Sequence, residues 1–111
     1  MNGFYSIYFT GTTGSGFGLV ALKDGTIIGA DVTGGTFDGQ YEVIGNQIEG
    51  KFINKLPPGA MSITGLTAGP DGLTLEYPLR LPLDLGAGHT IAMQTPYGPI
   101  NVIVKKIRDF A

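Results

Sequence analysis

The residues best suited to acid–base chemistry are one histidine and a few carboxylates. The chain has a single histidine, His89, and no cysteine. A general base can be built from His89 and a carboxylate such as Asp84 or Asp109, but the spacing gives no reason for these groups to meet. Thiol nucleophiles, disulfides and multi-histidine metal sites are excluded by composition. We therefore predict no catalytic residue, metal or cofactor, and keep an enzyme that uses His89 as the weakest of three hypotheses.

A second group of carboxylates, Asp38, Glu42 and Glu49, raises the question of a two-carboxylate hydrolase. These residues alternate with apolar neighbours along two short segments. Because alternate residues of a strand point to opposite faces, all three are expected on a solvated face. The pattern predicts a contribution to solubility rather than catalysis.

The segment Gly14-Ser15-Gly16-Phe17-Gly18 superficially resembles a phosphate-binding loop. Such a loop needs a helix directly after it, so that free N–H groups and the helix dipole meet the anion. Here the following residues have the alternation of a strand. We expect these glycines to serve a turn and close packing.

Composition limits the class of protein. The chain has 111 residues, 42% hydrophobic and 14% charged, which predicts one folded domain spanning residues 1–111. The 19 glycines and seven prolines disfavour a helical bundle. A net charge of −2 with scattered cations disfavours nucleic acid as a partner, and no apolar run is long enough for a membrane helix. The absence of cysteine is compatible with a reducing cytoplasm, where we expect the protein.

The elements that would position any site are short strands. Apolar and polar residues alternate in runs that end at glycine- or proline-containing turns. Asp24-Gly25, between two such runs, is a strong hairpin indicator, because both positions tolerate positive φ. We expect strands at residues 3–10, 16–23, 26–32, 36–44, 47–52, 61–68, 73–80, 89–95 and 100–108, with a loop at 55–60 and an irregular segment, a crossing or a lid, at 81–88.

Eight or nine consecutive hairpin-linked strands predict an all-β fold: a single antiparallel up-and-down β-barrel, in which closure removes exposed edges. Glycines at inward positions, Gly18, Gly39 and Gly50, are expected where strands must coil sharply. An eight-stranded barrel has room for side chains or one small ligand. The interior would be lined by Tyr41, Phe52, Tyr77 and Met93, so that a carrier of a small apolar ligand is one hypothesis for function.

The first and last strands carry apolar residues on both faces. Phe4 and Tyr8 oppose the inward residues of the first strand, and Ile103 and Ile107 oppose those of the last. If these two strands are neighbours, their outer residues form a patch larger than a monomer usually leaves in water. Either the segment 81–88 or loops cover them, or they form an interface, most simply in a two-fold homodimer.

An ordered set of short motifs resembles the GrlR-like family, named for a negative regulator of bacterial type III secretion. The set is Tyr5-Ser6-Ile7-Tyr8-Phe9, Gly16-Phe17-Gly18, Leu22-Lys23-Asp24-Gly25, Ile28-Gly29-Ala30-Asp31 and Phe37-Asp38-Gly39-Gln40-Tyr41. It covers roughly the first half of the chain.

The resemblance implies a lipocalin-like (calycin-type) barrel in the bacterial cytoplasm that forms a homodimer, is not an enzyme and acts by binding protein. The family's founding regulator sequesters a transcriptional activator and has acidic residues in the turn between its fourth and fifth strands. The matching turn here is Ile44-Gly45-Asn46-Gln47, without an acidic cluster. The family's partner-binding residues are therefore not expected in this chain.

Overall fold

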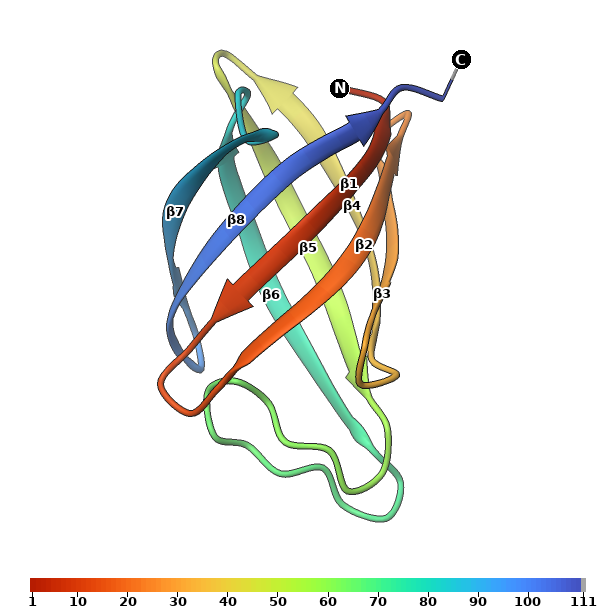
Figure 1. Ribbon diagram of the computed structural model, residues 1–111, viewed down its shortest axis with the longest axis vertical. Helices are drawn as coiled ribbons and strands as arrows, with labels where there is room; N and C mark the ends of the chain where they lie inside the picture. Colours follow the sequence, from red (N-terminus) through yellow and green to blue (C-terminus); the bar gives the residue numbers. More distant parts are fainter. Residues whose placement is uncertain (111) are drawn as a thin grey trace.

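A computed structural model describes residues 1–110 as eight strands, with no helix among them (Figure 1). The alternation of apolar and polar residues accounts for each strand, because one face of every strand is buried in the barrel and the other is solvated. The strands are β1 (Gly3–Thr10), β2 (Ser15–Lys23), β3 (Thr26–Asp31), β4 (Thr36–Ile44), β5 (Gln47–Leu56), β6 (Leu73–Pro82), β7 (Ala87–Thr95) and β8 (Gly98–Arg108).

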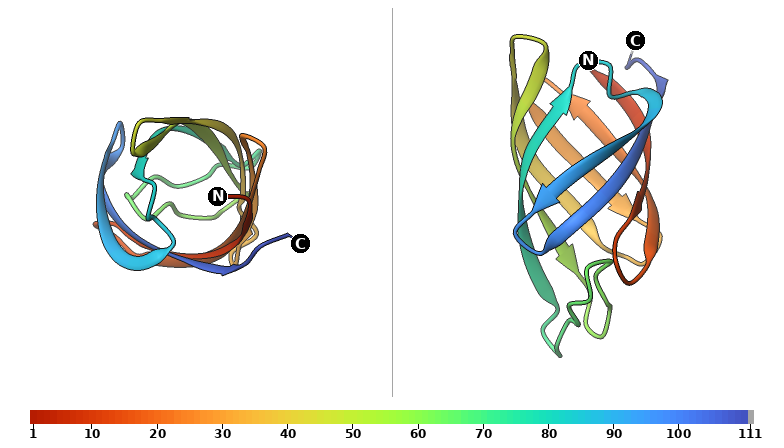
Figure 2. Two further views of the ribbon diagram at one scale, coloured as in Figure 1. Left: turned by 90° about the horizontal axis from the view of Figure 1, so that it is seen from above. Right: turned by 90° about the vertical axis from the view of Figure 1, so that its left-hand side faces the viewer.

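The strands form one antiparallel sheet in the order β6-β5-β4-β3-β2-β1-β8-β7, which curls into a nearly closed barrel (Figure 2). The predicted all-β barrel is confirmed, with eight strands. Within residues 1–110 the hydrogen-bonded ladder does not join β6 to β7. Strand β6 contains Pro78 and Pro82, which have no N–H to donate, and an unpaired edge is where a sheet tolerates proline.

The turn that joins β2 to β3 was predicted from the Asp-Gly pair and is confirmed. Asp24 has a φ of 50° and Gly25 a φ of 83°. Both angles are positive, as a tight two-residue hairpin requires, and β2 and β3 pair directly up to Lys23 and Thr26.

The barrel interior is filled by aromatic and aliphatic side chains from all eight strands. The inward glycines occur where the backbone of the neighbouring strand leaves no room for a side chain. A Cβ at Gly18 would lie 2.5 Å from the Ala30 carbonyl oxygen, and one at Gly50 would lie 2.8 Å from the Tyr41 Cα. These close approaches agree with the expectation that the inward positions need small residues.

The connection between β5 and β6 differs from the prediction. Residues 61–68 were expected to form a strand, but they contain only an isolated bridge between Met61 and Thr67. Strand β5 instead continues to Leu56, through part of the expected loop. The result is a long segment, residues 57–72, that crosses one end of the barrel, which we call the lower mouth (Figures 1 and 2).

The segment 81–88, expected to be irregular, is half strand and half turn. Strand β6 continues to Pro82 and β7 begins at Ala87, so only four residues form the turn. Leu85 in this turn is 3% exposed and packs into the core at the opposite, upper mouth. The glycines and prolines of the segment therefore allow a tight turn, and the side chain of Leu85 closes the upper mouth of the barrel.

Candidate functional site

The histidine and its candidate carboxylates do not form a site. His89 is exposed on β7, Asp84 is in the β6–β7 turn, and Asp109 follows β8. Among residues 1–110, the imidazole of His89 takes part in no hydrogen bond and no ion pair, and Asp109 pairs instead with Lys106. No cluster of three metal-ligating side chains occurs in the described part of the chain.

The other carboxylates lie on the outer surface, as predicted. Asp38 and Glu42 are exposed on β4, and Glu42 lies directly across from Glu49 on β5. An ion pair joins Glu49 to Arg80 of β6, with 3.6 Å between oxygen and nitrogen. These residues face solvent and border no cavity, so the arrangement is that of a solvated sheet face.

The glycine-rich segment is also structural. It leads into β2 rather than a helix. A Cβ at Gly16 would overlap the ring of Phe9, which lies opposite it on β1. Close packing of the Phe9 ring against Gly16 therefore explains the glycine, and close packing was predicted.

The four interface candidates lie on the outside of the barrel. Phe4, Tyr8 and Ile107 are exposed, and Ile103 is half-buried. Strands β1 and β8 are hydrogen-bonded neighbours, with Tyr8 directly opposite Ile103. The segment 81–88 lies at the upper mouth and leaves Phe4 and Tyr8 more than 40% exposed, so it does not cover the patch.

The exposed apolar surface extends further than predicted, onto β2 and β3. Phe17 lies opposite Tyr8, and Leu19 and Ile28 are 54% and 60% exposed. These residues alternate with the inward Gly18, Val20 and Ile27, so the period-2 pattern of β2 and β3 was sufficient to place them outside. We call this surface the outer apolar face; it consists of Phe4, Tyr8, Phe17, Leu19, Ala21, Ile28, Ala30 and Ile103.

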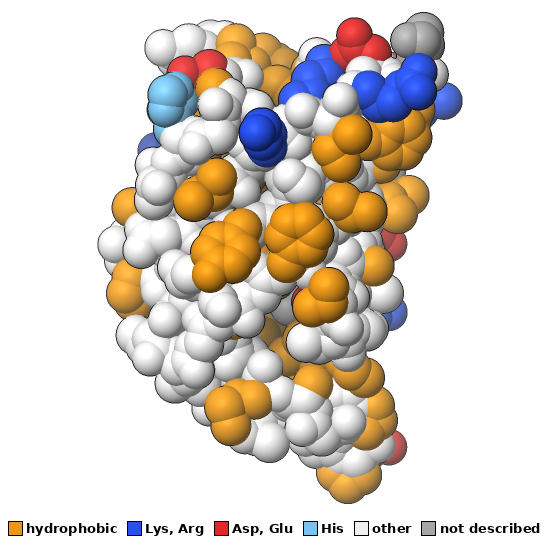
Figure 3. All heavy atoms as spheres, in the orientation of Figure 1, with side chains coloured by type: hydrophobic (Ala, Val, Ile, Leu, Met, Phe, Trp, Pro, Cys, Tyr) orange, Lys and Arg blue, Asp and Glu red, His pale blue; other side chains and the backbone are white. Residues whose placement is uncertain are grey.

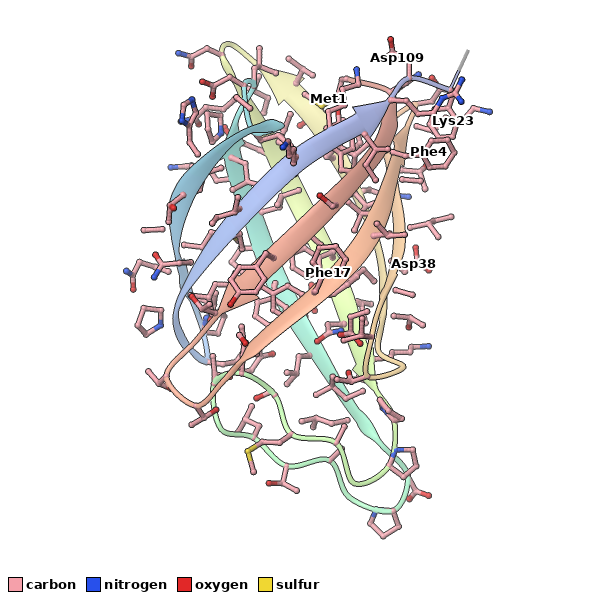
Figure 4. The ribbon with its side chains drawn as sticks, viewed as in Figure 1. Met1, Phe4, Phe17, Lys23, Asp38 and Asp109 are labelled. Atoms are coloured by element: carbon pink, nitrogen blue, oxygen red, sulfur yellow. The ribbon has the colours of Figure 1, made fainter. Side chains whose placement is uncertain are left out.

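The outer apolar face contains no charged side chain, but charges of opposite sign flank it. Figure 3 shows apolar side chains gathered over β1 and β2, with cations at the upper end. Lys105 and Arg108 lie on the β8 side, and Asp38 lies on the β4 side, next to Ile28 (Figure 4). Phe110, which follows β8, packs against Phe4 with the two rings tilted at 53° and 4.5 Å between their centroids.

The four interior candidates all lie on inward-facing positions. Tyr41, Tyr77 and Met93 are buried, and Phe52 is half-buried and packs against the core. Phe52 stacks on Tyr77 with 5.1 Å between ring centroids. Phe52, Tyr77 and Met93 line a cavity, whereas Tyr41 contributes only to packing.

Two cavities occupy the barrel. The larger, about 110 Å³, lies toward the lower mouth, and the smaller, about 80 Å³, lies in the upper half. They adjoin one another, because both are lined by Ile7, Phe37, Phe52, Leu79 and Leu81. An engineered apolar cavity of about 150 Å³ holds benzene, so the two adjoining spaces together suit a molecule of one ring and not a long lipid.

The segment 57–72 covers the larger cavity. Its residues Met61, Ser62 and Ile63 line the space. The segment is held to the β1–β2 turn through Thr13, whose backbone N–H and side-chain hydroxyl both donate to the Ile63 carbonyl, at 3.0 and 2.9 Å. Gly11 packs directly against the same carbonyl.

Burial alters the acidity of two tyrosines. Desolvation raises the pKa of Tyr77 above its ordinary value, and neighbouring Tyr97 raises it further. Desolvation also raises the pKa of Tyr5, against the opposing effect of Lys106. Near the C-terminus, the hydrogen bond from Lys106 lowers the pKa of Asp109. None of these groups is joined to a nucleophile or a proton relay in the described structure.

Comparison with known protein families, curated proteins and solved structures finds no match for this chain. Residues 1–110 include no helix of the length and apolar character needed to cross a bilayer.

Proposed function

We propose that this protein is a non-enzymatic binding protein that acts through its outer apolar face. The observation that carries this proposal is the contiguous row of exposed side chains across β8, β1, β2 and β3, including Tyr8, Phe17 and Leu19, with no charge among them. An uncharged apolar surface of this kind marks a protein contact.

The first occupant of the face is a second copy of the chain. In a two-fold dimer whose axis runs along the strands, the β8 side of one copy meets the β4 side of the other. Lys105 and Arg108 then approach Asp38 of the partner subunit, so the two flanks attract. The surface is therefore complementary to itself in charge as well as in polarity.

The resemblance to the GrlR-like family extends this proposal to a role. The dimer is a bacterial cytoplasmic regulator that sequesters a transcriptional activator by protein–protein interaction. The turn at 44–47 has no acidic residue, so the activator is bound through a different surface from that of the founding regulator.

Analytical ultracentrifugation at micromolar concentration tests the dimer. The wild type is expected to sediment as a dimer, and Tyr8→Lys as a folded monomer, because a lysine buried in the interface would be unpaired. Leu83→Lys is the matched control: Leu83 is 40% exposed in the β6–β7 turn, where its N–H donates to the Asn46 carbonyl, and it belongs neither to the outer apolar face nor to its charged flanks. A monomeric wild type, or equal effects of the two lysines, would refute the proposal.

A second candidate function is carriage of a small apolar ligand inside the barrel. It is favoured by the adjoining cavities and by their largely apolar lining, which includes Phe52, Tyr77 and Met93. Native mass spectrometry of the purified protein tests it: a bound mass that is lost on denaturation supports the carrier, and a mass equal to the bare chain contradicts it.

A further inference from the structure

The larger cavity has a polar feature that gives a ligand a preferred orientation. Asn54, on β5, is 7% exposed and lines the cavity. Its amide nitrogen donates to the Thr36 carbonyl oxygen at 3.1 Å. Because a carbonyl can only accept, the atom of Asn54 that faces Thr36 must be the nitrogen, and the other amide atom is the oxygen Oδ1.

The Asn54 Oδ1 is free to bind a ligand. No residue among 1–110 donates a hydrogen bond to it. The described structure has no fully buried side-chain oxygen or nitrogen without a partner, so Oδ1 must keep some open surface, and the cavity is the space that Asn54 lines. An acceptor at the edge of an apolar cavity selects a ligand that carries one O–H or N–H donor.

Two other polar groups of the lining, Asp31 Oδ2 and the Tyr77 hydroxyl, take part in no hydrogen bond among residues 1–110; both can accept one, so they keep the preference for a donor on the ligand. The Asp31 Oδ1 accepts hydrogen bonds from Thr33 and Gly35, and the Ser62 hydroxyl is bonded to Thr64 and to the Leu66 N–H. Asp31 is the only charged residue of the lining. A negative charge beside an apolar space disfavours an anion, so a carboxylate-bearing molecule is a poor ligand.

The way into the cavity lies at the edge of the segment 57–72. Most lining residues are buried or half-buried, but Ser15, Thr33 and Met61 are exposed. They belong to the start of β2, the β3–β4 turn and the crossing segment. The opening is therefore the gap bordered by these three elements at the lower mouth.

From these observations we propose that the barrel binds a neutral, mostly apolar molecule of one ring with a single hydrogen-bond donor, which donates to Asn54 Oδ1. The molecule passes through the opening beside the segment 57–72. This inference rests on the carrier function and is independent of the outer apolar face.

Phenol and toluene test the proposal, because they share size and shape and differ in one donor. Two-dimensional ¹H–¹⁵N NMR titration of the intact protein is expected to shift the amides of Asn54, Ile63 and Leu79 with both compounds. Phenol is expected to bind about five- to tenfold more tightly, the usual net contribution of one hydrogen bond. Benzoate is expected to cause no shift in these amides.

Two variants identify the site. Asn54→Leu removes the acceptor and is expected to abolish the preference for phenol while toluene still binds. Ile63→Trp fills the cavity from the crossing segment, does not alter the strands, and is expected to abolish binding of both compounds; it keeps the test decisive if Asn54→Leu does not fold.

Equal affinity of phenol and toluene for the wild type, shifts confined to the outer apolar face, or no shifts at all would overturn the proposal. Sedimentation of Ile63→Trp separates the two functions: this variant is expected to dimerise as the wild type does. A loss of ligand binding with an intact dimer therefore concerns the cavity alone.

Discussion

Gly39 lies directly opposite Phe52 across the β4–β5 pair, and a Cβ at position 39 would come 2.6 Å from the Phe52 Cα. The two residues share an inward face, and the backbone of β5 at Lys51 and Phe52, with the Phe52 Cβ, occupies the space that a side chain at 39 would need. Phe52 in turn stacks on Tyr77 and contacts Phe37, so the glycine supports a row of inward aromatic rings.

Gly39→Ala is expected to destabilise the barrel by about 2 kcal/mol, the usual range for overpacking against backbone atoms. Urea unfolding measures the change. Gly14→Ala is the control, because nothing lies within 4 Å of its added Cβ and it is expected to have little effect. Equal stabilities for the two variants would show that Gly39 is not required by packing.

Tyr77 gives the fold a defined response to alkali. Its raised pKa means that the folded state favours the neutral phenol more than the unfolded state does. The stability due to this group is complete below about pH 10, the ordinary tyrosine value, and is lost as the pH rises through the higher pKa of the folded state.

Tyr77→Phe is therefore expected to flatten the fall in stability above about pH 10, with Tyr5 responsible for part of what remains. Thermal unfolding between pH 8 and 11 measures this dependence of stability on pH. Tyr8→Phe, which removes an exposed hydroxyl, serves as the control. If both variants follow the wild-type profile, Tyr77 does not set the alkaline limit.

The segment 57–72 is expected to open more often when Thr13 loses its hydroxyl. Thr13→Val removes the hydroxyl's hydrogen bonds to the Ser62 and Ile63 carbonyls and keeps the backbone bond. We expect hydrogen exchange at the Leu66 and Ala68 amides to rise about two- to fivefold, with global stability unchanged. Thr12→Val, next to it and exposed, is the control; an equal rise there would exclude Thr13 as the anchor.

The charges flanking the outer apolar face are expected to set the strength of the dimer. Asp38→Lys makes both flanks basic and is expected to raise the dimer dissociation constant several-fold at low salt, and less at 0.5 M salt because of screening. Asp71→Lys, which makes the same charge change within the segment 57–72, is expected to have no such effect. Recovery of the dimer when Asp38→Arg is combined with Arg108→Asp would confirm that the two flanks meet.

Local pattern was enough to predict the barrel, because inward and outward residues alternate at period 2 and turns such as Asp24-Gly25 have an unambiguous chemistry. It was not enough for residues 61–68, which alternate like a strand but have no neighbouring strand to pair with. Pairing is a property of the whole sheet, so a single segment does not encode it.

The same distinction applies to the candidate sites. The alternation placed Phe4 and Tyr8 on the outer face, and the same alternation could have placed Phe17 and Leu19 there. Asn54 could not be identified from the sequence, because its importance depends on which of its amide atoms faces Thr36 and on the empty space beside it. Cavities arise from side-chain packing between strands far apart in sequence, and no local spacing reveals them.

The gap in the ladder between β6 and β7 leaves the wall of the barrel cut along its length. A hydrogen-bonded ring of strands resists any change in circumference, since widening it would break a complete row of bonds. Here, β6 and β7 can separate slightly without breaking a backbone hydrogen bond between them. The circumference of the barrel can therefore change at the boundary between these two strands. The volume available inside is thus set by side-chain contacts across the cut rather than by the sheet itself.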